Sequence, residues 1–175
     1  MYRVMGVDPS LTSTGVAYRV ASGVRAYTIQ TKYKGTRRLR HIRDALLQHI
    51  KACNPTLVAM EGYALGFRGK SNTVFGLGEL GGVLRVALAE QGLEVLIVPP
   101  TSLKMYITGS GRADKDEVKD KLVTTYKAPH FPTSDQYDAY GLLLMGEEVC
   151  AGRQGSKVSL PYRSRALAGC ALMDF

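Results

Sequence analysis

The chain has 175 residues, which is room for one compact domain and too few for two full-sized ones. Lysine and arginine number 23 against 15 aspartates and glutamates, so the net charge of +8 favours an anionic partner, nucleic acid first among them. A hydrophobic share of 45% excludes intrinsic disorder for the bulk of the chain.

The first third of the chain predicts a meander of strands followed by a helix. Strands are expected over Tyr2–Asp8, Thr14–Val20 and Val24–Thr31. The Ser22-Gly23 pair is expected to form the hairpin turn. An amphipathic helix is expected over Thr36–Ala52, because apolar residues recur there at helical spacing.

The rest of the chain predicts strands that alternate with helices. Asn54-Pro55 precedes a continuous apolar strand over Thr56–Glu61, and a glycine-dotted segment over Gly62–Asn72 follows it. A further strand is expected over Glu94–Val98. Helices are expected over Thr73–Gln91, Thr101–Ile107, Asp114–Tyr126 and Ser134–Val149. This order predicts a mixed α/β sheet flanked by helices.

Two domain-level expectations follow from the far end of the chain. Residues 1–149 are expected to form the folded domain, and residues 150–175 a basic extension with little core of its own.

The three cysteines lie far apart and form no CxxC pair, which favours a reduced cytoplasmic setting. No run approaches the ~20 apolar residues of a membrane span, so no membrane partner is expected.

Glycines are unusually frequent in the helix expected over Thr73–Gln91. The stretch from Gly76 to Gly81 matches GxGxxG, but it follows no strand, so we expect no nucleotide cofactor. Each glycine inside a helix costs roughly 1 kcal/mol relative to alanine. The shared small-residue face of Gly78, Gly82 and Ala89 therefore suggests close approach of another backbone, either the protein's own sheet or a partner helix.

Acidic residues stand at the ends of two expected strands and at the start of a helix. Asp8 and Glu61 follow apolar strands, at the edge where open α/β sheets place their ligand sites. Asp135 and Asp138 lie three apart at a helix start and share a face. Two plainer explanations stay open: a first solvated residue after a strand, and a helix-start acid within the capping chemistry of Thr133 to Gln136.

Four converging carboxylates would repel one another unless cations neutralised them. Hard oxygen ligands suit Mg²⁺ or Mn²⁺ better than zinc. Two such ions about 4 Å apart activate a water and stabilise the leaving oxygen in phosphodiester hydrolysis. The pattern therefore suggests a metal-dependent nuclease.

In order along the chain, these segments resemble the RuvC family of Holliday-junction resolvases, within the ribonuclease H-like superfamily. The stretch from Gly6 to Gly15 is similar to the family's first strand with its metal-binding acid, and Val58–Glu61 to its second acidic strand end. Ser134–Ala139 is similar to the closing acid-x-x-Asp-Ala helix start. Thr101–Lys104 and Gly109–Lys115 resemble the block that contributes two basic residues near the cleaved phosphate.

The resemblance implies a ribonuclease H-like mixed sheet of five strands and a crossover junction endodeoxyribonuclease with two Mg²⁺ ions per site, for which Mn²⁺ substitutes. The implied metal ligands are Asp8, Glu61, Asp135 and Asp138. Lys104 and Lys115 would neutralise the phosphate. From the residues alone, Lys115 is also explained as a solvated position of a helix that begins at Asp114.

DNA contacts are expected around this site. The segment after Glu61 offers cations for phosphates and aromatic rings for unstacked bases, at Tyr63, Phe67, Arg68 and Lys70, and Arg112 is added from the basic block. The arginines at 37, 38, 40 and 43 form a second cluster, for which a solvated helix face and a binding surface are equally open. Three features resemble the phage-type branch of the family: Ser10, the positions of the aromatic residues after Glu61, and the chain beyond Cys150.

The resemblance also implies a homodimer, because the corresponding helix of RuvC-like resolvases forms their dimer interface and a symmetric junction needs two sites. We therefore expect an enzyme that resolves Holliday junctions or related branched DNA in the cytoplasm of a bacterial or phage-infected cell. The alternative is a non-catalytic branched-DNA-binding module of the same fold. A sugar-kinase-like ATPase is disfavoured, since that architecture needs two such domains to enclose a nucleotide.

Overall fold

The fold of this chain is given by a computed structural model that describes residues 2–62, 71–156 and 160–173. The strands are β1 (Val4–Asp8), β2 (Ser13–Val20), β3 (Gly23–Gln30), β4 (Leu57–Glu61), β5 (Glu94–Val98) and β6 (Ala171–Met173). The helices are α1 (Gly35–Cys53), α2 (Ser71–Glu90), α3 (Pro100–Thr108), α4 (Lys115–Thr124), α5 (Ser134–Arg153) and α6 (Pro161–Ala168).

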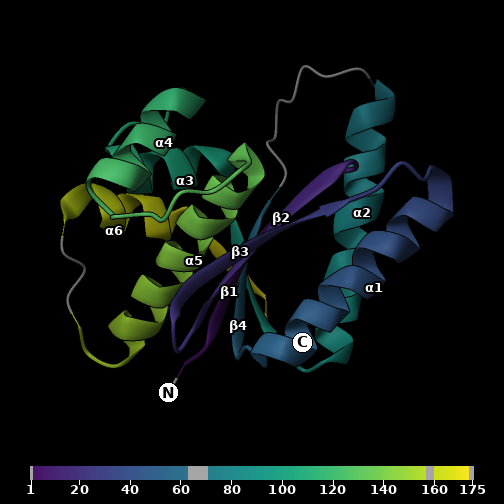
Figure 1. The fold of residues 1–175 in the computed structure, drawn as a ribbon. Coiled ribbons are helices and arrows are strands. Elements are labelled where there is room, and N and C mark those ends of the chain that lie inside the picture. Colours follow the sequence, from purple (N-terminus) through teal and green to yellow (C-terminus); the bar gives the residue numbers. More distant parts are fainter. Residues whose placement is uncertain (1, 63–70, 157–159, 174–175) are drawn as a thin grey trace.

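The strands form one mixed sheet in the order β3-β2-β1-β4-β5-β6 (Figure 1). The central strands β1, β4 and β5 run parallel to one another, whereas β2, β3 and β6 pair antiparallel with their neighbours. The expected mixed α/β sheet with flanking helices is confirmed. The described residues form six strands rather than the expected five, because Ala171–Met173 add β6 beside β5.

Helices cover both faces of the sheet (Figure 1). α1 and α2 lie on one face, and α5 lies on the other with α3, α4 and α6 outside it. The apolar core is accordingly split into two layers, one under α1 and α2 and one under α5. Every residue of β1 is buried, as its continuous apolar run predicts for a strand covered on both faces.

The pleat of β1 determines which way its last residue points. Met5 and Val7 belong to the layer under α1 and α2, whereas Val4 belongs to the layer under α5. Because side chains alternate along a strand, Gly6 and Asp8 face α5 together with Val4. The same alternation in β4 turns Glu61 toward α5, since Leu57 and Ala59 lie in that layer.

Two glycines let α5 lie directly on the sheet. A Cβ atom on Gly6 would stand 2.0 Å from the carbonyl oxygen of Ala139, and one on Gly15 would stand 2.0 Å from that of Asp135. Neither position has room for any side chain. These contacts fix the start of α5 beside the ends of β1 and β2.

The chain beyond Cys150 contributes to the same fold. α5 continues to Arg153, past the expected end at Val149, so the expected boundary between residues 149 and 150 falls inside this helix. α6 packs against α3, and its Ala166 is 2% exposed. The division into a nuclease domain (1–149) and a basic extension (150–175) therefore stays a prediction about roles.

None of the helices within the described ranges is both long enough and apolar enough to cross a membrane.

Candidate active site

Two acids meet at the carboxyl edge of the sheet. Asp8 is the last residue of β1 and Glu61 the last of β4. These strands are parallel neighbours in a register that pairs Val7 with Met60, so both carboxylates leave the sheet side by side. Asp8 is only 8% exposed, although it is an acid. Burial at this level is not what a first solvated residue after a strand would show.

The start of α5 brings two more acids to this edge. Asp135 accepts a hydrogen bond from the hydroxyl of Ser13, the first residue of β2. Asp138 lies one turn further along α5, and the charges of Asp135 and Asp138 both act on Asp8. Thr133 does not form the expected side-chain capping bond and instead pairs with the hydroxyl of Thr28 at 2.9 Å, whereas Asp135 does lie in the first turn of α5, where an acid is favoured by the helix dipole.

Both expected lysines face the acids. The ammonium of Lys115 stands 3.8 Å from Asp138 Oδ2. Lys115 is the first residue of α4, which a capping box of Asp114 and Glu117 starts. Lys104 projects from α3 and acts electrostatically on Glu61 and Asp138. The plain and the functional explanations of Lys115 are thus compatible, since the cap that begins α4 also directs Lys115 to the site.

The site perturbs its own carboxyl groups. Burial, then the charge of Glu61 and then that of Asp138, raise the pKa of Asp8 well above its usual range. Burial also raises the pKa of Glu61 and of Asp138, and the charges of Lys115 and Lys104 oppose both rises. Negative charge is therefore concentrated beyond what these two lysines offset.

The donor set suits a hard divalent cation in kind but is not closed around one point. Across residues 2–62, 71–156 and 160–173, no group of three or more His, Cys, Asp or Glu side chains has the geometry to hold a metal ion. The carboxylate of Asp135 accepts a hydrogen bond from Ser13 and is thus directed at a partner outside the acid group. The oxygen chemistry and mutual repulsion of the four acids fit Mg²⁺, because a bound cation relieves the repulsion between neighbouring carboxylates.

Of the five residues expected to contact DNA, the structure describes only Arg112. Tyr63, Phe67, Arg68 and Lys70 lie outside the described residues. Arg112 is exposed in the turn before α4, where its backbone N–H donates to Ser110 Oγ at 3.3 Å. Its side chain is thus on the surface one turn from Lys115.

Several contributors to the site had no clear signal in the sequence. Ser13 holds Asp135, and Gly6 and Gly15 admit α5, yet each role depends on a helix more than a hundred residues away. A pocket of about 210 Å³ also opens beside Asp138. Lys115 and Lys119 line it on the same side of α4, four residues apart.

Comparison with known protein families finds one that spans most of the chain. The family described as crossover junction endodeoxyribonuclease RuvC matches residues 4–144. The protein of that name from Mycolicibacterium smegmatis is 32% identical over 152 residues, covering 81% of this chain and 80% of the relative. The one from Thermotoga petrophila is 31% identical over 140 residues, covering 76% and 84%.

Solved structures share the fold. T. thermophilus RuvC in complex with a Holliday junction substrate aligns with a TM-score of 0.71 at 24% sequence identity, over 89% of this chain and 97% of that one. The yeast mitochondrial Holliday junction resolvase Ydc2 aligns with a TM-score of 0.57 at 12% identity, over 94% and 83%. At these identities the likeness concerns the ribonuclease H-like architecture.

Proposed function

Because the chain belongs to the RuvC family of crossover junction endodeoxyribonucleases, we propose that it cuts branched DNA, with four-way junctions as its principal substrate. One observation carries the proposal: acids from β1, β4 and α5 gather at one sheet edge beside Lys115. A non-catalytic DNA-binding module would gain nothing from buried negative charge where phosphates approach.

The metal ligands of this proposal are Asp8, Glu61, Asp135 and Asp138. They would hold two Mg²⁺ ions, with Mn²⁺ as a substitute. When bound, the ions supply charge neutralisation at the cleaved phosphate and a more acidic water. The raised pKa of Asp8 supports this assignment, since a buried carboxyl group in a cluster of like charges is typical of functional sites.

The remaining groups act on the DNA itself. Lys115 and Lys104 neutralise the phosphate as negative charge develops on it. Hydrolysis forms one bond from a water oxygen to phosphorus and breaks one P–O ester bond, leaving a phosphate on one end and a hydroxyl on the other. Tyr63, Phe67, Arg68, Lys70 and Arg112 would contact the strands around the cut.

The protein is proposed to act as a homodimer, because a two-fold junction presents two equivalent strands for cutting. Support comes from α2, which has large apolar side chains on its surface: Phe75 is 70% exposed and Val86 is 60% exposed. A methyl group placed on Gly82 would meet none of the described residues within 4 Å. Gly82 therefore does not serve a close approach to the protein's own sheet.

The proposal predicts structure-selective, metal-dependent cutting. A labelled four-way junction, a replication fork, a flap and a plain duplex are incubated with the protein in Mg²⁺, Mn²⁺ or EDTA. We expect the junction to be cut fastest, both metals to support cutting and EDTA to abolish it.

Two results would overturn this account in different ways. Tight junction binding without cutting in either metal would favour the non-catalytic module. Equal cutting of all substrates would leave a nuclease but remove the junction as its substrate.

A further inference from the structure

A dense group of cations lies at the start of α1, outside the catalytic site. From Thr31 to Arg43 the chain has six basic residues and no acid: Lys32, Lys34, Arg37, Arg38, Arg40 and Arg43. We call this group the α1 patch. Arg43 pairs with Asp44 at 2.6 Å. Within the described part of the chain, the side chains of Lys32, Lys34 and Arg40 form no hydrogen bond or ion pair.

The α1 patch leaves the sheet at the same edge as the acids. Gln30 at the end of β3 pairs with Ser13, and Asp8 pairs with Gly15 in the neighbouring ladder. The backbone continues along this edge, since Thr31 N donates to Thr12 O at 3.1 Å. Two strand spacings separate β3 from β1, roughly 10 Å. Because α1 lies on the face opposite α5, DNA that crosses the ends of β2 and β3 from the acids first reaches Lys32 and Lys34, where the chain leaves the sheet.

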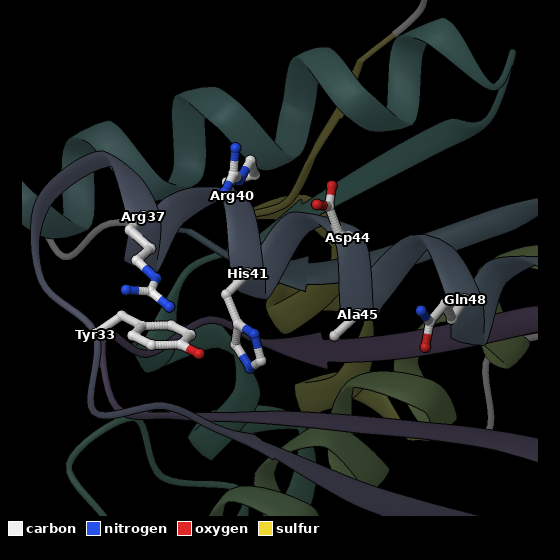
Figure 2. A pocket seen from close by; sticks show the side chains of 7 residues that line it. All are labelled: Tyr33, Arg37, Arg40, His41, Asp44, Ala45 and Gln48. Carbon is white, nitrogen blue, oxygen red and sulfur yellow. The ribbon is translucent and has the colours of Figure 1, made fainter.

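The α1 patch is built around a held aromatic ring. The guanidinium of Arg37 lies 4.0 Å from the centre of the Tyr33 ring, and His41 meets that ring edge-on at 5.3 Å. Arg38 Nε donates to the carbonyl oxygen of Tyr33 at 2.7 Å. Figure 2 shows Arg37, Tyr33 and His41 together on one side of α1. An arginine stacked on a ring loses less freedom when its outward N–H groups bind a phosphate.

A surface pocket of about 330 Å³ lies along this group, and Arg40, Asp44 and Gln48 line it further along α1 (Figure 2). The helix start itself is electrostatically unfavourable. Its first turn has no acidic residue and its N-cap, Lys34, makes no side-chain capping bond. Cations near a helix N-terminus oppose the helix dipole. A polyanion bound at the start of α1 would interact favourably with both the cations and the helix dipole.

We propose that the α1 patch binds the phosphate backbone of a duplex arm of the DNA substrate, beside the strand that is cut. This inference rests on the proposed function. Charge is the basis of recognition, so the contact is independent of base sequence and its free energy depends on salt. Duplex DNA is the favoured occupant over an acidic protein, because the α1 patch shares its sheet edge with the site that acts on DNA.

The test compares the affinity of two double variants for a labelled four-way junction. Arg37→Gln with Arg40→Gln removes two cations of the α1 patch, and Lys51→Gln with Lys121→Gln removes two exposed lysines elsewhere. Fluorescence anisotropy in EDTA gives the Kd over a series of salt concentrations. We expect the first variant to bind about tenfold more weakly near physiological salt, with a log K against log salt slope shallower by about 2.

The control should match the wild type in Kd and slope, and both variants should keep the wild-type circular dichroism spectrum. Equal loss in both variants would mean that only net charge matters, and an unchanged Kd and slope in the first would remove the α1 patch from DNA binding. Either result overturns the inference. The labelled strand is checked for cutting afterwards. Cutting in EDTA would refute the proposed metal dependence while the affinities still test the α1 patch.

Discussion

At the scale of single residues, Asp8 shows the strongest conflict between burial and charge. It follows four buried residues of β1 and faces three other carboxylates, all of which raise its pKa together with burial. The folded protein would be more stable with an apolar residue at such a position. The acid is therefore expected to lower stability and to be compensated only when a cation binds.

This conflict predicts a stability gain on removing the charge. Because the folded-state pKa of Asp8 is raised, its favourable contribution is complete below its unfolded pKa and is lost as pH rises through the folded pKa. Asp8→Asn should therefore stabilise the protein in EDTA at neutral pH by about 1 kcal/mol, and less in acid. Thermal unfolding measures this, and Mg²⁺ should raise the Tm of the wild type but not of the variant.

Asp120→Asn, at an exposed position of α4, is the matched control and should leave Tm and its response to Mg²⁺ unchanged. Two results together would show that Asp8 has an ordinary structural role. The Tm of the wild type would not change with Mg²⁺, and the Asp8→Asn variant would be less stable than the wild type in EDTA.

Sequence reasoning succeeds at this scale where a residue's environment is local. Asp8 and Glu61 end apolar runs, so their place at a sheet edge follows from their own strands. Ser13 and Gly15 differ, because their roles depend on α5 crossing β2, and nothing near them in the sequence specifies that crossing.

At the scale of elements, the central strands of the sheet follow from their own sequence, whereas the last strand, β6, depends on a distant part of the fold. β1, β4 and β5 each have five residues, four of them in an unbroken non-polar run, and this pattern makes them predictable from the sequence. β6 has three residues, too few for a periodic pattern, and it forms because α6 places it beside the free edge of β5.

The charges near the end of the chain are partly paired. Arg163 Nη1 lies 3.3 Å from Glu148 Oε2, and Arg153 Nη1 lies 2.7 Å from Glu94 Oε2.

The surface of α2 predicts a dimer that one substitution disrupts. Phe75, Gly82 and Val86 lie seven and four residues apart, which places them on one face of the helix. Val86→Lys puts a charge on this face and should convert a wild-type dimer into a monomer at micromolar concentration. Sedimentation velocity gives the oligomeric state.

Val123→Lys is the control, since Val123 is also an exposed apolar residue but lies on α4. It should leave the wild-type dimer intact. A monomeric wild type, or a Val86→Lys variant that remains a dimer, would rule out this face of α2 as the interface.

At the scale of the whole molecule, the net charge of +8 is unevenly distributed. Carboxylates concentrate where β1 and β4 end and α5 begins, whereas the α1 patch follows the end of β3, two strands away from β1. Composition predicts an anionic partner but not this arrangement, which arises only when the strands align. The surplus positive charge would hold DNA from beside a site that repels it until cations bind.

The most direct test of this account is the single-turnover rate of four-way junction cutting by Glu61→Gln, with Glu90→Gln as the matched control at an exposed position of α2. Loss of a metal-binding carboxylate removes several kcal/mol of transition-state stabilisation, so Glu61→Gln should cut at least about a thousandfold more slowly in Mg²⁺. Glu90→Gln should cut at the wild-type rate. Full-rate cutting by Glu61→Gln, or cutting by the wild type in EDTA, would contradict metal-dependent catalysis by these acids.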